Sequence, residues 1–108
     1  MAFVLQKSAS ISWPITVRKP SDGGKFQDQK FDALFRHIGR ERFNELIELG
    51  DEALTNEILV GWKNIEDGEG NEIEFNEENK KLLLDDFIVV KTLIEEYGKF
   101  ITGGAEKN

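Results

Sequence analysis

The sequence predicts a single α+β domain, with an N-terminal β-hairpin followed by a mostly helical part. Two changes of pattern indicate this. Apolar and polar residues alternate over residues 10–18, which is typical of a half-buried strand. From residue 31 onward, apolar residues recur every three or four positions, as on one face of a helix. The 108 residues are enough for one hydrophobic core, so residues 1–108 are expected to form one domain.

The hairpin is expected within residues 1–30. The apolar side of its first strand consists of every second residue: Ile11, Trp13, Ile15 and Val17. Pro14 lies on the polar side and has no N–H to donate, so this strand should lie at a sheet edge. Residues 20–24 predict a turn and residues 25–30 the return strand. Phe3 and Leu5 could add a short third strand.

Residues 31–103 predict about four to five short helices. The first is expected near residues 30–37, stopped by Gly39. The next continues to Gly50. Asp51 could cap a third helix, which would end at Gly61 and Trp62.

A turn over residues 63–75, which could form a small hairpin, separates these helices from the last two. Asn76 resembles the N-cap of a helix, with carboxylates in the turn that follows. Asp85 and Asp86 could cap a closing helix that begins near Phe87. Structural roles are expected for four residues: Trp13, Gly61, Trp62 and Asn76.

The closing helix carries an apolar stripe, which is the candidate partner-binding surface. Its members are Phe87, Val90, Ile94, Tyr97 and Ile101. Packing against the protein's own helices is the alternative that we favour for this stripe. Gly103 and Gly104 should end the helix, and residues 104–108 are expected to form a flexible tail.

Composition argues against several classes of function. The chain has no cysteine and one histidine, which excludes disulfides, thiol catalysis and a multi-histidine metal site. His37 has no identifiable partner carboxylate, so we expect neither an enzyme nor a cofactor. A net charge of −7 argues against nucleic acid as the main partner. No targeting segment or membrane span is visible, so a soluble cytoplasmic protein is expected.

Residues 67–78 have some features of a calcium-binding loop. Oxygen ligands fall at positions 1, 3 and 5, and Glu78 falls at position 12. However, Glu72 replaces the glycine of position 6 and Glu74 the apolar residue of position 8. We therefore favour an acidic turn before a capped helix, and expect no metal.

Charge is unevenly distributed along the chain. Residues 1–38 have six Lys or Arg and three Asp, whereas residues 39–108 have eight Lys or Arg and eighteen Asp or Glu. The acidic part is best explained as a solvated helical surface. Alternatively, such a molecule could associate head to tail with its own copies or bind a basic partner.

An ordered set of features runs from a Gly-Trp pair at residues 61–62 to the end of the chain. It comprises an Asp/Gly turn, an extended Ile73-Glu74-Phe75, a capped helix with Leu82-Leu83, and a closing helix with Tyr97. Upstream, Phe31, Phe35 and Leu46 fit the same order. This set resembles the tail assembly chaperones of long-tailed bacteriophages and prophages.

The resemblance implies a non-enzymatic protein that binds the tape-measure protein and keeps it soluble in the cytoplasm of the bacterial host. It also implies that a longer, frameshifted form recruits the tail-tube protein, and that neither form stays in the mature virion. The alternative function is a small acidic inhibitor that mimics DNA toward a host nucleic-acid-binding protein.

Overall fold

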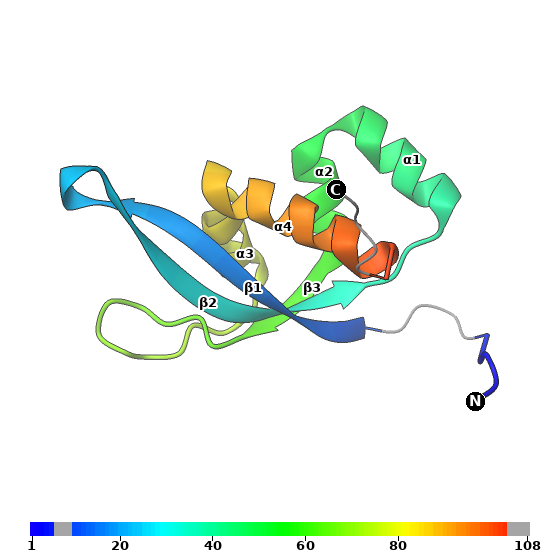
Figure 1. The fold of residues 1–108 in the computed structure, drawn as a ribbon, viewed down its shortest axis with the longest axis horizontal. Helices are drawn as coiled ribbons and strands as arrows, with labels where there is room; N and C mark the ends of the chain where they lie inside the picture. Colours follow the sequence, from blue (N-terminus) through cyan, green and yellow to red (C-terminus); the bar gives the residue numbers. More distant parts are fainter. Residues whose placement is uncertain (6–9, 104–108) are drawn as a thin grey trace.

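The computed structural model describes residues 1–5 and 10–103. A three-stranded antiparallel sheet, in the order β1-β2-β3, has helices packed on one face (Figure 1). The predicted α+β class with an N-terminal hairpin is confirmed. The predicted flexible tail of residues 104–108 lies outside the described residues.

Strands β1 (Ser10–Ser21) and β2 (Lys25–Arg36) form a long hairpin around the 3₁₀ turn η1 (Asp22–Gly24). They pair in register from Ser10 opposite Arg36 to Ser21 opposite Lys25. Strand β1 lies at the edge of the sheet, as the proline at position 14 predicts.

The helix predicted at residues 30–37 is wrong, because β2 continues to Arg36. Phe31, Ala33 and Phe35 are all buried, so the pattern has a period of two. Phe31 and Phe35 are also four residues apart, a spacing that is typical of one face of a helix. The sequence alone therefore predicted the wrong element. This segment is extended because β2 pairs with β1 on one side and β3 on the other, and the pairing supplies hydrogen-bond partners for its backbone N–H and C=O groups.

The third strand is β3 (Leu59–Lys63), which pairs with β2. Phe3 and Leu5 are exposed and lie in no strand, so the third strand predicted from them is wrong. The segment expected to end a helix instead places Trp62 opposite Ala33, on the covered face of the sheet. Burial of an extended apolar segment beside β2 outweighs its local helical spacing.

Gly61 of β3 lies against Leu34 of β2. A Cβ atom at position 61 would stand 3.3 Å from the Cβ of Leu34, closer than side chains normally pack. Glycine therefore lets the two strands pack at this point.

The helices are α1 (Arg40–Leu49), α2 (Asp51–Ile58), α3 (Glu77–Leu84) and α4 (Phe87–Ile101). Gly50 ends α1 with φ 115°, a conformation that favours glycine. The cap predicted from Asp51 is wrong, because Asp51 is already the first residue of α2. Asn76 does cap α3, accepting a hydrogen bond from the Asn79 N–H at 2.8 Å.

Helix α4 lies over the sheet and buries Val89, Leu93 and Tyr97. The Tyr97 hydroxyl donates to the Arg36 carbonyl at 2.8 Å and accepts from the Ile38 N–H at 3.2 Å. Both partners lie where β2 turns toward α1. This burial raises the pKa of Tyr97, because the phenolate would lose its hydration.

Candidate functional site

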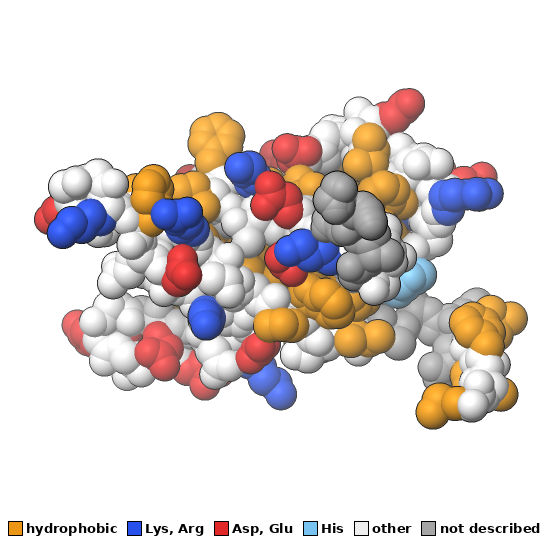
Figure 2. Space-filling view, in the orientation of Figure 1, with side chains coloured by type: hydrophobic (Ala, Val, Ile, Leu, Met, Phe, Trp, Pro, Cys, Tyr) orange, Lys and Arg blue, Asp and Glu red, His pale blue; other side chains and the backbone are white. Residues whose placement is uncertain are grey.

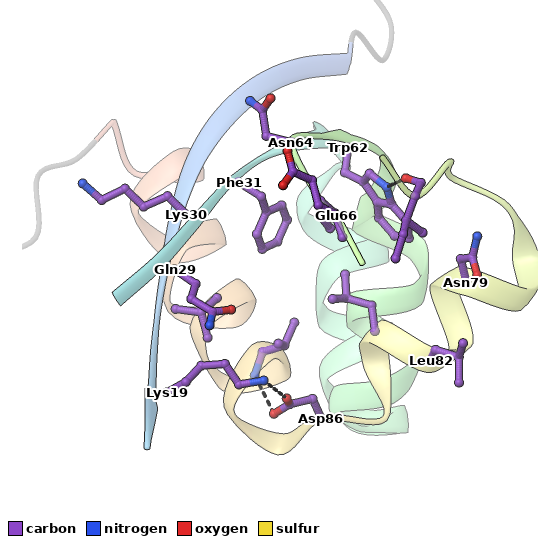
Figure 3. A pocket seen from close by; sticks show the side chains of 15 residues that line it. Lys19, Gln29, Lys30, Phe31, Trp62, Asn64, Glu66, Asn79, Leu82 and Asp86 are labelled. Carbon is purple, nitrogen blue, oxygen red and sulfur yellow. Dashed lines mark hydrogen bonds and ion pairs between the residues drawn. The ribbon is translucent and has the colours of Figure 1, made fainter. Parts of the chain in front are cut away.

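A hollow of about 340 Å³ lies between the covered face of the sheet and α3 (Figure 3), and we call it the groove. Its apolar side chains come from the strands, the loop after β3, and α3. They include Val17, Phe31, Trp62, Ile65, Leu82 and Leu83. Phe31 projects from β2 into the space, while Leu82 lies on the α3 side. The groove thus joins segments that are far apart in the sequence.

Trp62 holds the loop that closes one side of the groove. Its Nε1 donates to the Ile73 carbonyl at 2.8 Å, and its ring meets the edge of Phe75 with centroids 4.8 Å apart. The Ile73 N–H in turn donates to the Ile65 carbonyl at 2.8 Å. Together with an antiparallel bridge between Glu66 and Glu72, these bonds form the small hairpin predicted for this segment.

Asp67 organises the tip of this loop. Its Oδ1 accepts from the backbone N–H groups of Asn71 at 2.9 Å and Glu69 at 2.8 Å. These bonds hold the pKa of Asp67 below its usual value, because they favour the carboxylate. The Asp67 carboxylate therefore stabilises the acidic turn by accepting hydrogen bonds from its backbone. Within residues 1–5 and 10–103, no group of three or more Asp, Glu or His side chains could hold a metal ion.

Polar groups border the groove where β1 meets the start of α4. Lys19 Nζ and Asp86 Oδ2 form an ion pair at 3.0 Å (Figure 3). Asp86 Oδ1 also accepts from the Ile88 N–H at 2.9 Å and so caps α4, as predicted. Partial burial opposes ionisation of Asp86, but the bonds from Lys19 and the α4 backbone outweigh it and lower the pKa.

The chemistry of the groove suits an apolar side chain of a partner. We define its floor as the apolar side chains of the sheet, Val17, Phe31 and Trp62; polar and charged side chains also line the groove. Trp62 is 7% exposed and its indole N–H is already bonded, whereas Leu82 is 70% exposed. An incoming side chain can cover Leu82 without breaking a hydrogen bond of the floor.

The structure divides the predicted stripe of α4. Tyr97 is buried in the protein's own core, and Ile94 and Ile101 pack partly against it. Phe87 is 91% exposed and Val90 is half-buried. Packing against the protein itself therefore accounts for most of the stripe, and partner binding by its exposed members stays a prediction.

Other predicted residues lie away from the groove. Trp13 donates from Nε1 to Glu96 Oε1 at 2.9 Å and meets the edge of Phe100, so it joins β1 to α4. His37 lies in the exposed loop after β2, with its ring 6.0 Å from that of Phe100.

Sequence reasoning missed the groove. Phe31 was assigned to a helix, and Leu82 was noted only as part of a Leu-Leu pair. The one available signal was the period-two series Phe31, Ala33 and Phe35, which would have placed Phe31 on the buried side of a strand.

The structure is therefore that of a small α+β protein with a partly apolar groove between its sheet and α3. Residues 23–108 match the family model described as YdaY prophage protein, so the chain belongs to this family and is a phage or prophage protein. Neither a curated protein nor a solved structure matches it. Among the helices of the described residues, none is long and apolar enough to span a lipid bilayer.

Proposed function

We propose that this prophage protein is a non-enzymatic tail assembly chaperone that acts in the cytoplasm of the bacterial host. Its groove would bind apolar side chains of the tape-measure protein and keep that protein soluble. A longer, frameshifted form would recruit the tail-tube protein, and both would leave before the virion is complete. Membership of a prophage family and the resemblance of roughly residues 12–108 to such chaperones support this proposal.

The groove is the observation that carries the proposal. A helical partner presents apolar side chains at intervals of three and four residues, and a groove of this kind can accept them. Covering the exposed Leu82 and the apolar floor would remove apolar surface from water, which stabilises a complex by about 25 cal/mol per Å².

The net charge of −7 supports the same function. A strongly charged protein stays soluble, so it can keep an apolar partner in solution.

Co-expression with a fragment of the tape-measure protein from the same prophage tests the proposal. We expect the wild-type chain to co-purify with the fragment and to raise its soluble fraction. Leu82→Asp should abolish both effects, because it places a charge beside the apolar floor. Ile47→Asp is the matched control, since Ile47 is 51% exposed on α1 and lies outside the groove.

Failure of the wild-type chain to retain the fragment would overturn the function. Loss of binding in Phe87→Asp, with binding intact in Leu82→Asp, would instead assign the partner to the exposed stripe of α4.

The second candidate function is the acidic DNA mimic. The excess of ten acidic over basic residues in residues 39–108 favours it. Competition with DNA for a host nuclease distinguishes the two functions, because a chaperone should not displace DNA. Inhibition that requires the acidic residues would support the mimic.

A further inference from the structure

The distal half of the hairpin projects beyond the helices (Figure 1). We call residues 18–30 the arm. Lys19 is half-buried through its contact with Asp86, and the other residues of the arm are exposed. Beyond the helices the two strands have no covering layer, so their exposed side chains are open to contact with another molecule.

Arg18 and Phe26 form an exposed pair on the arm. The Arg18 guanidinium carbon lies 4.6 Å from the centroid of the Phe26 ring, and Phe26 is 55% exposed. The neighbours of Arg18 in β1, Val17 and Lys19, face the groove, so the pleat directs Arg18 to the opposite side. The pair therefore faces away from the protein's own helices.

The arm also differs in charge from the rest of the chain. It has four basic and two acidic side chains, in a protein of net charge −7. A surface that combines carboxylates with an exposed phenylalanine would complement it.

Such a surface exists on α4, and we call it the α4 patch: Phe87, Val90 and Ile94, bordered by Asp51, Lys91 and Glu95. These residues surround a shallow hollow. Phe87 is 91% exposed, Val90 and Ile94 are half-buried, and Lys91 forms an ion pair with Glu95 at 3.9 Å. Figure 2 shows exposed hydrophobic side chains above the start of α4, with acidic and basic ones beside them.

We propose that the arm of one copy of this protein docks on the α4 patch of a second copy. Phe26 packs against Phe87, and Arg18 lies beside the carboxylates of Asp51 and Glu95. A second copy is the occupant because this chain presents both halves of the contact, opposite in charge and each with an exposed phenylalanine.

The contact joins two different surfaces, so it is head to tail. Each copy keeps an unused arm or an unused patch, and the assembly grows by addition of further copies. Because the arm and the patch are oppositely charged, added salt should weaken the contact.

Sedimentation velocity of the full chain tests this arrangement. For wild type we expect the average mass to rise with concentration at low ionic strength, and to fall toward the monomer in about 1 M salt, where charges are screened beyond about 3 Å. Phe26→Ser and Phe87→Ser should each remain monomeric at concentrations where wild type assembles. Ile47→Ser, an exposed position outside both surfaces, should assemble as wild type does.

Mixing the two defective variants gives the sharper result. Phe26→Ser retains a patch and Phe87→Ser retains an arm, so an equimolar mixture should form a 1:1 dimer and grow no further. Arg18→Glu should also lose assembly and regain it when mixed with Asp51→Arg.

A monomeric wild type at all concentrations and salt levels would overturn the proposal. Assembly of wild type that persists in Phe87→Ser, or a mixture of the two variants that stays monomeric, would overturn it as well.

Discussion

The two halves of the β1-β2 hairpin share one continuous ladder but have different surroundings. In the proximal half, Ile15, Ala33 and Phe35 are fully buried. In the arm, Phe26 stays 55% exposed, although its strand is paired just as regularly. The proximal half differs because α4 covers the face on which Ile15, Ala33 and Phe35 lie, whereas Phe26 lies on the opposite face of the arm, which no helix covers.

This difference shows that strand pairing alone does not make a core in this protein. Backbone hydrogen bonds continue through both halves, but only the covered half removes apolar surface from water. Stability should therefore depend on the proximal half, while the arm remains available for contact with another molecule.

Truncating the centre of the covered half should have the largest effect. Phe35 is fully buried and packs edge-on against Tyr97, with centroids 5.1 Å apart. We expect Phe35→Ala to lower the free energy of unfolding by about 3–5 kcal/mol, because it leaves a cavity. Urea denaturation measures the loss, and a change below about 1 kcal/mol would contradict the assigned role of α4.

Removing the Tyr97 hydroxyl should have the next largest effect. Tyr97→Phe keeps the ring contacts but leaves the Ile38 N–H and the Arg36 carbonyl without this partner. We expect a loss of about 1–3 kcal/mol in the free energy of unfolding, the usual consequence for an unsatisfied buried group. Faster amide hydrogen exchange at Ile38 would locate the effect where β2 meets α1.

A smaller, pH-dependent effect is expected where the arm meets α4. The pKa of Asp86 is lowered in the folded protein, so its ionised form stabilises the fold fully above the ordinary value of 3.8. That contribution is lost as the pH falls through the lower, folded pKa. Asp86→Asn should cost roughly 0.2–1 kcal/mol at pH 7, because it removes the ion pair with Lys19 but keeps an oxygen that can cap α4.

Thermal unfolding of wild type and Asp86→Asn across pH measures this effect. The difference in melting temperature should shrink as the pH falls below about 4. Glu48→Gln is the control, since Glu48 is exposed on α1, outside the groove and the α4 patch. A difference that is independent of pH would show that the charge of Asp86 contributes nothing.

The smallest effect on stability is expected in the arm. Phe26→Ser should change the free energy of unfolding by less than about 0.5 kcal/mol when measured at concentrations where the protein is monomeric. The comparison with Phe35→Ala contrasts two phenylalanines of the same strand. A large loss in Phe26→Ser would show that the arm belongs to the stable core.

Local signals in the sequence predicted much of the fold. The hairpin turn, the end of α1 at Gly50 and the caps at Asn76 and Asp86 were all found, because each depends on residues within about four positions. The candidate site was harder to predict from the sequence. Its lining combines Phe31, Trp62 and Leu82, which only the packed structure brings together.

By itself, the sequence determined where this chain turns, where its last two helices begin, and how its charge is divided. Only the tertiary structure decided that β2 continues past residue 30, that β3 replaces a predicted helix end, and that α4 buries Val89 and Leu93. The physical reason is that caps and turns are satisfied by neighbours along the chain. A strand and the buried side of a helix are chosen by distant partners, as in the pairing of Ala33 with Trp62.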